Sequence, residues 1–404
     1  MINKEEDEKG INLLKKIISF KNENNISFPI KVIIAGGDGT VLSMIQTFFK
    51  EGIDINHCIF GHMPLGTGND LSNACGFSNS VDISENRIDL LYNILIKYIK
   101  AKCGKIDIWR IQLKLDPNKG KMLYNEKDKK VELKDKDGNI VREFDRTIIN
   151  YFSFGYDARV GYNFDKKRTS SRFCNKCVYF CEGMKKNCCR QNLTVPKFLK
   201  SFTVYEDNYN KDQNITITSN KFEETNNKKV KIKFQFKSKL SLLPAKNSEN
   251  TIIIKGDPVS IIGQNINYYM AGVKDIWKAG KDNLDLQVIS QKEDDKDKYT
   301  NKLKAMSKQI QSMDDKALEF FTFSNGFTTG FEKVFGGFGK KLYHGGGPIV
   351  MKFFETKEYD VNDKYGRIYL NCDGEYYHVV CPLEMRIELD RSMCNGQLPF
   401  LINK

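Results

Sequence analysis

The stretch VIIAGGDGTVLSMI, residues 32–45, decides the fold of the first part of the chain. It places three glycines and one aspartate between two apolar runs. The first run is a short β-branched segment typical of a strand, and the second has the spacing of an amphipathic helix. A glycine-rich loop is therefore expected to join a strand to a helix here, which is the repeating unit of an α/β domain.

The first hundred residues repeat this order. The segment 58–77, CIFGHMPLGTGNDLSNACGF, again runs from an apolar stretch through a glycine-rich loop to a helix start. The segment 87–100, RIDLLYNILIKYIK, predicts an amphipathic helix with positions 88, 91, 94, 95 and 98 on one apolar stripe. We therefore expect an α/β nucleotide-binding domain over residues 1–103.

The pattern changes near residue 104. Runs such as KIDIWRIQL, NITITS, KVKIKFQF, TIIIKG, RIYLNCDG and MRIEL have the β-branched and aromatic alternation of strands. These runs predict a β-rich second domain over 104–390, followed by a C-terminal tail at 391–404. Two polar stretches, near 116–139 and 291–316, are expected to be surface insertions.

Composition narrows the class of protein. The 404 residues are 40% hydrophobic, which is typical of a folded chain, and the net charge of +13 favours an anionic partner such as a nucleotide, a nucleic acid or an acidic membrane. The first twenty residues carry acids where a signal peptide needs a basic start, and no run of about 18 apolar residues follows. The prediction is a cytoplasmic protein whose eleven cysteines are reduced thiols.

The loop GGDGT has the residues that a phosphate site needs. Gly36, Gly37 and Gly39 let backbone N–H groups approach a ligand, and the following helix presents its partially positive N-terminus. An ordinary strand-to-helix turn is the alternative. Asp38 favours the phosphate site together with a cation, because a carboxylate repels phosphate unless a metal such as Mg²⁺ lies between them.

The loop GTGND, about thirty residues later, repeats the combination of glycines and an aspartate before a helix. Gly66 and Gly68 flank Thr67, and Asp70 stands where a helix should begin. Asp70 alone could be a helix N-cap. Together with Asp38, it predicts two carboxylates at neighbouring strand ends that share a hydrated metal.

These loops belong to a longer series of motifs. In chain order, GGDGT, PLGTGNDLS, KIDIW, NYFSFGYDARVGYNFD (150–165) and YLNCDGEYY (369–377) resemble the catalytic and accessory regions of eukaryotic diacylglycerol kinases. GGDGT is shared with NAD kinases and phosphofructokinases, whereas PLGTGND with NYFSFGYDA is much more specific. Sphingosine and ceramide kinases usually replace the Asp that follows GN, so Asp70 favours the diacylglycerol branch.

The resemblance implies a Rossmann-like, phosphofructokinase-like α/β domain followed by a β-sandwich-like accessory domain for the lipid substrate. It implies a kinase that uses ATP and Mg²⁺ to convert diacylglycerol to phosphatidic acid at an anionic membrane surface, bound peripherally and without a nucleic-acid partner. The alternatives are a ceramide or sphingosine kinase, and a nucleotide- or membrane-binding pseudokinase. The family's first strand and its NPxSG-like loop have no match in the roughly 30 residues before KVIIA, so we expect that strand to be missing.

Site residues follow from the matched motifs. ATP phosphates are expected at Gly36, Gly37, Asp38, Gly39 and Thr40, and at Gly66, Thr67, Gly68 and Asn69, with Mg²⁺ held through water by Asp38 and Asp70. In bacterial relatives the motif DGE supplies the group that activates the lipid hydroxyl, which here means Asp373 or Glu375. The alternative for this motif is a hairpin turn, because Asp-Gly is a favoured turn dipeptide.

Three further features remain open. AGKDNLDLQVI (279–289) resembles a segment that holds a structural Mg²⁺ in bacterial members, and Asp282 and Leu284 would be the ligands; a surface turn is the alternative. The cysteines of CNKCVYFCEGMKKNCC suggest zinc, or a helix on which Cys177 and Cys181 face a core. The basic run from Arg159 to Lys200 is either a solvated face or a contact with an anionic bilayer.

Overall fold

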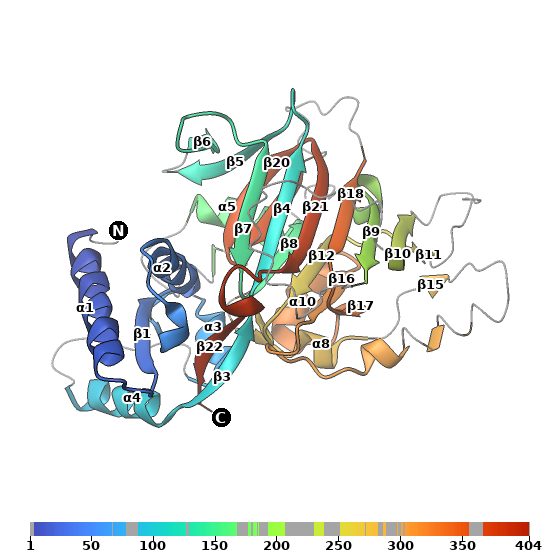
Figure 1. The fold of residues 1–404 in the computed structure, drawn as a ribbon. Coiled ribbons are helices and arrows are strands. Elements are labelled where there is room, and N and C mark those ends of the chain that lie inside the picture. The colour runs from blue at the N-terminus through green and yellow to red at the C-terminus, as the bar shows by residue number, and fades with distance from the viewer. Residues whose placement is uncertain are drawn as a thin grey trace. The chain divides into compact units, whose positions relative to one another are not determined.

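The computed structural model describes residues 4–66, 68–77, 88–126, 129–167, 177–178, 181–183, 185, 193–206, 230–237, 251–270, 272–281, 286–287, 297, 300–301, 304–354 and 367–403. The chain divides into two compact units (Figure 1). Unit 1 comprises Met1–Ile106 and Arg391–Lys404, and unit 2 comprises Asp107–Asp390. Unit 1 is mixed α/β and unit 2 is rich in sheet, which confirms the expected fold class at this coarse level.

Unit 1 is built on a four-stranded sheet in the order β1-β2-β22-β3. Its elements are α1 (Lys4–Glu23), β1 (Ile30–Gly36), α2 (Asp38–Lys50), η1 (Ile55–His57), β2 (Cys58–Pro64), α3 (Asp70–Ala74), α4 (Ile88–Lys100), β3 (Lys102–Asp107), η3 (Cys394–Gly396) and β22 (Gln397–Ile402). β1 and β2 are parallel, and β22 is parallel to β2. Both glycine-rich loops therefore leave the same edge of the sheet.

The expected C-terminal tail is wrong. Residues 391–404 belong to unit 1, where β22 lies between β2 and β3 and its Phe400 and Leu401 are fully buried. The strand is recruited because QLPFLI is apolar enough to fill the middle of the sheet. A contact of the chain end with the C-terminal end of α3 reinforces this, since the Asn403 amide donates to the Cys75 carbonyl at 2.8 Å.

The helix after the first loop forms for the reason that the pattern predicts. α2 buries Val41, Leu42, Ile45 and Phe48, which recur on one helical face. The expected helix at 87–100 is also present as α4, but Leu91 and Leu95 of its predicted apolar stripe remain 40% and 37% exposed. Periodicity therefore predicted the helix, but not how much of its apolar stripe is covered.

Unit 2 contains two eight-stranded sheets. The first, in the order β15-β11-β10-β9-β18-β21-β4-β7, comprises β15 (Leu286–Gln287), β11 (Thr251–Lys255), β10 (Val230–Lys237), β9 (Leu199–Tyr205), β18 (Ile349–Phe353), β21 (Pro382–Leu389), β4 (Trp109–Leu115) and β7 (Glu143–Ile148). The second, in the order β17-β16-β12-β8-β19-β20-β5-β6, comprises β17 (Lys340–Gly345), β16 (Leu318–Phe323), β12 (Ser260–Gln264), β8 (Tyr151–Gly155), β19 (Ile368–Cys372), β20 (Glu375–Val380), β5 (Lys121–Glu126) and β6 (Lys129–Glu132). The remaining named elements of this unit are β13 (Tyr268–Tyr269), β14 (Val273–Lys274), α5 (Tyr156–Asp165), α7 (Val195–Phe198), α8 (Ile276–Ala279) and α10 (Gly326–Phe335).

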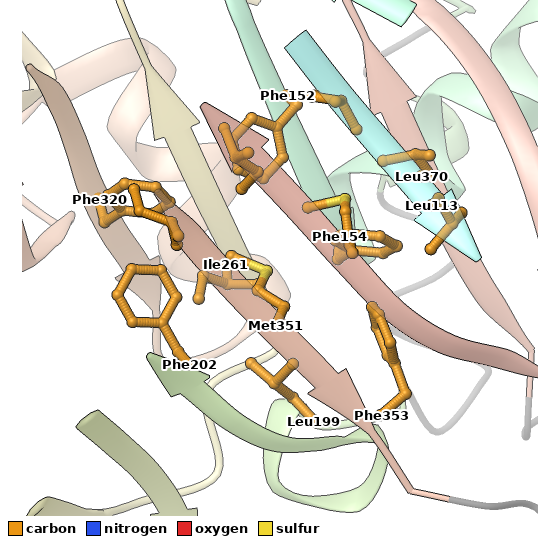
Figure 2. Close-up of a cluster of buried hydrophobic side chains, with 14 of the residues drawn as sticks. Leu113, Phe152, Phe154, Leu199, Phe202, Ile261, Phe320, Met351, Phe353 and Leu370 are labelled. Carbon is orange, nitrogen blue, oxygen red and sulfur yellow. The ribbon is translucent and has the colours of Figure 1, made fainter. Parts of the chain in front are cut away.

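One hydrophobic core joins the two sheets of unit 2. Phe202 and Met351 from the first sheet and Phe154, Ile261 and Phe320 from the second belong to the same buried cluster, which Figure 2 shows. The rings of Phe202 and Phe320 meet edge to face with centroids 4.8 Å apart. The burial of these large side chains is the main force that holds the two sheets together.

The expected surface insertion at 116–139 is also wrong in part. This segment forms β5 and β6 at the edge of the second sheet, and Met122 is fully buried in the core. Lysines and acids dominate the sequence there because an edge strand exposes one face and its charged residues discourage pairing with other chains. Composition alone therefore indicated a loop where the chain forms an edge hairpin.

Candidate active site

The two glycine-rich loops of unit 1 lie against each other. The Gly36 carbonyl accepts hydrogen bonds from the amides of Leu65 and Gly66, at 2.8 and 3.1 Å. A Cβ added at Gly66 would lie 2.6 Å from the Gly37 Cα, so the second loop can approach the first only because residue 66 has no side chain. The sequence predicted loops at one sheet edge, and the structure brings them into backbone contact.

Asp38 joins the two loops. Its Oδ2 accepts a hydrogen bond from the Asp70 amide at 2.9 Å, and its Oδ1 accepts one from the Leu71 amide at 3.1 Å. These are the first amides of α3, so Asp38 caps a helix that begins 32 residues later in the chain. The carboxylate is only 14% exposed. Asp38 thus stabilises the start of α3, and it is also a candidate ligand for Mg²⁺.

The alternative of Asp70 as N-cap is wrong. The N-cap of α3 is Asn69, in the left-handed conformation with φ 55°, and Asp70 is the first residue of the helix with a buried side chain. The Asn69 side chain folds back on its own loop, because its Oδ1 accepts from the Gly66 amide and its Nδ2 donates to the Gly66 carbonyl. Asn69 therefore shapes the loop that was predicted to hold phosphate.

His62 lies behind the first loop and was not singled out from the sequence. Its Nε2 is 3.0 Å from the Gly36 carbonyl oxygen, and its Nδ1 is 3.6 Å from Asp38 Oδ1. Burial lowers the pKa of His62 to about 4, against the opposing effect of the Gly36 carbonyl. A neutral imidazole that donates from Nε2 to the carbonyl fits this geometry. Its signal in the sequence was a single polar residue inside the apolar strand CIFGHMP.

The N-terminus of α2 fits an anion. Its N-cap is Gly37, which has no side chain that could cap the helix amides. The space next to Gly39 is open, because a Cβ built there would have nothing within 4 Å. Helix N-termini of this kind bind phosphate through backbone N–H groups and the helix dipole. The carboxylates of Asp38 and Asp70 are oxygen ligands of the kind that Mg²⁺ prefers. Thr67, Asp282 and Leu284 lie outside the described residues.

Asp373 lies in a two-residue turn between β19 and β20. Cys372 pairs with Glu375 across this hairpin, and both Asp373 and Gly374 have positive φ, of 48° and 84°, as a type I′ turn requires. The turn alternative is therefore realised at this motif. The turn nevertheless keeps the Asp373 side chain inside unit 2, where it is 8% exposed.

Three backbone amides surround the Asp373 carboxylate. Oδ2 accepts from Ile149 at 2.8 Å, and Oδ1 accepts from Asn150 and Tyr151 at 2.9 Å each. The motif NYFSFGYDA thus meets the motif CDGE in space, although more than 200 residues separate them. Burial raises the pKa of Asp373 to about 6, and the three amides partly oppose this shift.

Glu375 is in a different setting at the start of β20. Its carboxylate forms an ion pair with Arg146 and accepts a hydrogen bond from the Tyr377 hydroxyl at 2.8 Å. Burial favours a higher pKa, but the hydrogen bond and charge of Arg146 outweigh it and hold the pKa of Glu375 below its usual value. The neighbouring acids of one motif are therefore tuned in opposite directions.

Comparison with known families decides the membership of this chain. The model of the diacylglycerol kinase accessory domain matches residues 147–376, which is more than half of the chain, and the model of the diacylglycerol kinase catalytic domain matches residues 7–103. The chain belongs to the diacylglycerol kinase family.

Relatives of this diacylglycerol kinase family member come from plants and animals. It is 27% identical over 168 residues to diacylglycerol kinase 7 of Arabidopsis thaliana, covering 37% of this chain and 34% of that protein. It is 32% identical over 117 residues to diacylglycerol kinase eta of Mesocricetus auratus, covering 28% of this chain and 9% of that protein. The matched part thus spans about a third or less of these relatives. A solved structure of a candidate diacylglycerol kinase from Bacillus anthracis str. Sterne covers 92% of this chain and 76% of its own, with a TM-score of 0.36 and 12% identity.

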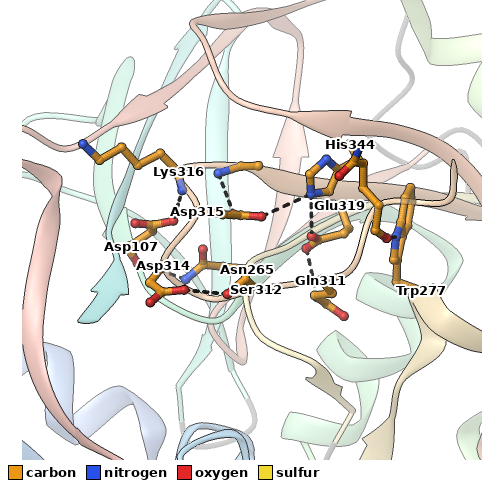
Figure 3. A network of polar contacts seen from close by, with 12 residues as sticks. Asp107, Asn265, Trp277, Gln311, Ser312, Asp314, Asp315, Lys316, Glu319 and His344 are labelled. Carbon is orange, nitrogen blue, oxygen red and sulfur yellow. Dashed lines mark hydrogen bonds and ion pairs between the residues drawn. The ribbon is translucent and has the colours of Figure 1, made fainter. Parts of the chain in front are cut away.

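The family motif KIDIW has a structural role in this chain. The Asp107 amide donates to the Met313 carbonyl at 2.7 Å, and the Asp107 carboxylate accepts a hydrogen bond from the Lys316 amide. Asp107 is fully buried, so these contacts fix the segment 313–316 that carries Asp315 (Figure 3). The expected insertion at 291–316 is therefore anchored to the unit at its C-terminal end.

That segment takes part in a charge cluster of unit 2, in which Glu319 is buried, His344 is partly buried and Asp315 is exposed. His344 Nε2 lies 3.3 Å from Asp315 Oδ2 and 3.3 Å from Glu319 Oε1, and Gln311 donates to the other Glu319 oxygen at 2.9 Å (Figure 3). Among the residues that the structure describes, these three form the one group of three whose ligand atoms lie close enough together for a metal ion. A protonated imidazole between two carboxylates satisfies the same geometry without a metal. Sequence reasoning missed this cluster because its members are up to 29 residues apart in the chain, and only the pairing of β16 with β17 sets Glu319 opposite His344.

The cluster predicts a pH-dependent stability of unit 2. Burial would lower the pKa of His344, but Asp315 and Glu319 outweigh it and raise the pKa to about 9. A raised folded pKa stabilises the protonated form, so the stabilisation is complete below the unfolded value of about 6.5 and is lost as the pH rises through about 9.

We therefore expect the melting temperature to fall between pH 7 and pH 9.5 and expect His344→Gln to flatten that fall, because Gln carries no titrating charge. Glu319, whose pKa burial raises to about 7, acts mainly below this window. His378→Gln is the matched control, because burial already lowers the pKa of His378 to about 3 and it is neutral throughout. An unchanged slope in the His344 variant would exclude His344 as the titrating group.

The cysteine and basic segments are only partly described. Cys177 and Cys181 are exposed, so the expectation that they face a core is wrong. Cys174, Cys188 and Cys189 lie outside the described residues. Arg159, at the start of the basic run, is buried on α5, while Lys167 forms an ion pair with Glu182 at 2.6 Å. No helix among the described residues combines the length and apolarity needed to cross a bilayer.

Proposed function

We propose that this chain is an ATP- and Mg²⁺-dependent lipid kinase that phosphorylates diacylglycerol to phosphatidic acid. The observation that carries the proposal is the junction of the two glycine-rich loops. There Asp38, the first residue of α2, accepts hydrogen bonds from the first amides of α3. This arrangement sets an anion site and a carboxylate side by side, as nucleotide phosphoryl transfer requires. Membership of the diacylglycerol kinase family favours this chemistry over that of other nucleotide-binding proteins.

Unit 1 has the nucleotide role in this proposal. The backbone of Gly36, Gly37, Gly39 and Thr40 binds ATP phosphates, and the second loop, Gly66–Asn69, completes the cradle. Asp38 and Asp70 hold Mg²⁺ through water, and the ion neutralises phosphate charge when bound. The unit is Rossmann-like and phosphofructokinase-like in this proposal, and residues 391–404 belong to it rather than forming a tail.

Unit 2 has the lipid role, with a β-sandwich-like organisation of its two sheets. A primary alcohol has a pKa far above 7, so a carboxylate that accepts its proton speeds the attack on phosphorus. Asp373 suits this role better than Glu375, because its pKa of about 6 makes it the stronger proton acceptor near neutral pH. Asp282 and Leu284 remain candidate ligands of a second Mg²⁺.

Two alternatives are tested together with the main proposal. A ceramide or sphingosine kinase would transfer phosphate to another lipid, and a pseudokinase would bind nucleotide or membrane without transfer. Radiolabelled ATP is supplied with mixed micelles of diacylglycerol, ceramide and sphingosine, and the lipid products are separated. Labelled phosphatidic acid as the main product supports the proposal; label in another lipid, or ATP binding without any labelled lipid, overturns it in favour of one alternative.

Glycine substitutions test the phosphate cradle directly. In Gly37→Ala the new methyl would lie 3.5 Å from the Gly66 Cα, an ordinary contact, and φ is −92°, so the fold is expected to tolerate it. We expect less than about 1 kcal/mol change in the free energy of unfolding but at least a roughly tenfold loss of ATP affinity, because the methyl occupies the space of a phosphate oxygen. Melting temperature and ATP dissociation constant are measured on one sample.

Two matched variants complete this test. Gly66→Ala is expected to lose stability even without ATP, because its methyl would lie 2.6 Å from the Gly37 backbone. Gly52→Ala, in an open turn with φ 72° at the far end of α2, controls for backbone strain without a phosphate. A stable Gly37→Ala protein that binds ATP normally would contradict the cradle.

A further inference from the structure

An exposed aromatic stripe runs along α10 in unit 2. Phe327, Phe331 and Phe335 are spaced by four residues, which places them on one side of the helix, and they are 46%, 46% and 73% exposed. The Phe331 ring also meets the rings of Phe335 and Phe338, with centroids 6.1 and 5.8 Å apart. We call Phe327, Phe331 and Phe335 the α10 stripe. Large apolar side chains grouped in this way on a surface indicate a binding face.

The acid of α10 is turned away from the stripe. Glu332 is the one acidic residue of this helix, and it is 4% exposed. Its carboxylate accepts hydrogen bonds from the amides of Gly337, Phe338 and Gly339, at 3.1, 2.5 and 2.8 Å. The helix therefore presents aromatic rings to the outside without an accompanying negative charge, and the buried Glu332 fixes the loop that follows.

Both ends of α10 are held in place. The Asn325 side chain accepts a hydrogen bond from the Thr328 amide at 2.9 Å, while the Asn325 amide donates to the Thr328 hydroxyl, which is a complete capping box. Gly336 ends the helix with φ 67°. A rigid helix loses little conformational entropy when it binds, so the stripe is prepared for contact.

Lysines border the loop end of the stripe. Lys281 is exposed and its Nζ lies 5.8 Å from the centroid of the Phe338 ring, and a β-bridge pairs Lys281 with Lys340. Lys278, on α8 just before this bridge, is also exposed. Phenylalanine rings bordered by lysines fit the surface of an anionic bilayer. The rings can enter the boundary between headgroups and acyl chains, and the lysines are attracted to acidic headgroups.

We propose that the α10 stripe is a docking element that lies in the surface of an anionic lipid bilayer. The ten residues of α10 span about 15 Å, half of the hydrocarbon thickness of about 30 Å, so the helix lies along the surface rather than crossing it. The stripe enters the interface between headgroups and acyl chains, with Lys278, Lys281 and Lys340 at the headgroup level. This inference rests on the proposed function in one respect, namely that a lipid substrate and an anionic lipid product bring the enzyme to a membrane.

Vesicle binding tests the docking element without any kinase reaction. The full chain is sedimented with vesicles of phosphatidylcholine containing phosphatidylserine, in the absence of ATP and diacylglycerol. The triple variant Phe327→Gln, Phe331→Gln, Phe335→Gln is expected to bind at least about tenfold more weakly, because three interfacial aromatic anchors are lost. Ile310→Gln and Phe354→Gln, which are 86% and 43% exposed outside α10, are the matched controls and are expected to bind like the parent chain.

A second readout separates this inference from the proposed function. With a short-chain, water-soluble diacylglycerol, the triple variant is expected to keep the parent turnover, whereas with diacylglycerol in vesicles its turnover falls. If the parent chain has no kinase activity but the triple variant still loses vesicle binding, docking stands and the proposed function fails. Equal vesicle binding by the parent and the triple variant, or no binding by either, overturns the docking proposal. A parent dimer that the triple variant converts to monomers, with vesicle binding unchanged, would assign the stripe to contact between two copies instead.

Discussion

Replacing Asp38 with Asn is expected to lower kinase turnover at least ~100-fold, because the variant loses the negative charge that is proposed to hold Mg²⁺ beside the phosphates. The structure adds a second effect. Each oxygen of the Asp38 carboxylate accepts a hydrogen bond from α3, Oδ2 from the Asp70 amide and Oδ1 from the Leu71 amide. An Asn side chain has one acceptor oxygen, so one of these amides would face an NH₂ group, and the free energy of unfolding should fall by about 1–3 kcal/mol.

The two effects of Asp38→Asn can be separated by matched measurements. Asp54→Asn removes the negative charge of another capping aspartate in the same unit but keeps its acceptor, because Asn can still accept from the Asn56 amide, which lies 3.1 Å from Asp54 in the turn before β2. Turnover, melting temperature and Mg²⁺ dependence are measured for both variants below their melting temperatures. We expect only Asp38→Asn to lose turnover while folded. Near-normal turnover in folded Asp38→Asn would contradict the proposed Mg²⁺-binding role and leave Asp38 with only its structural role of capping α3.

Replacing Asp373 with Asn is expected nearly to abolish turnover while ATP affinity stays close to normal, because the residue is proposed to act on the lipid hydroxyl. Asn tolerates the positive φ of 48° at this turn, so the backbone strain does not increase. The Asn NH₂ group must however face an amide of the 149–151 segment, and a stability loss of about 1–3 kcal/mol is expected. Turnover is therefore compared at a temperature where the variant is folded.

Glu375→Gln is the matched variant for Asp373→Asn. It removes the ion pair with Arg146 but keeps a hydrogen-bond acceptor for the Tyr377 hydroxyl. We expect its turnover to fall much less. A dead Glu375→Gln with an active Asp373→Asn would transfer the proton-accepting role to Glu375, and an equal loss of ATP binding in Asp373→Asn would make Asp373 structural.

The pH profile gives an independent test of Asp373. A proton acceptor works when it is deprotonated, and burial raises the pKa of Asp373 to about 6. The rate constant kcat/KM should therefore rise with pH through about 6 and level off above it. A rising limb centred well below 5 would instead point to a carboxylate with a lowered pKa, as in Glu375.

Local patterns predicted the elements that carry the unit 1 site. The two apolar runs on either side of GGDGT appear, as predicted, as the strand β1 (Ile30–Gly36) and the helix α2 (Asp38–Lys50). This succeeded because a strand, a glycine-rich loop and an amphipathic helix each depend on residues that are close in the chain. The same local reasoning failed at 116–139, where charged residues hide the strand pair β5 and β6 at a sheet edge.

The sequence by itself determined that glycines 36, 37 and 66 stand in tight loops after parallel strands and that Asp38 lies among them, since these are properties of residue type and short-range spacing. Only the tertiary structure decided what each carboxylate contacts. Asp38 caps a helix that begins 32 residues later in the chain, and the Asp373 carboxylate accepts hydrogen bonds from backbone amides more than 200 residues earlier. The strand β22 brings the chain end into the sheet of unit 1. The physical reason is that hydrogen bonds and burial depend on distance in space, and a single chain pattern carries no record of which distant segments fold together.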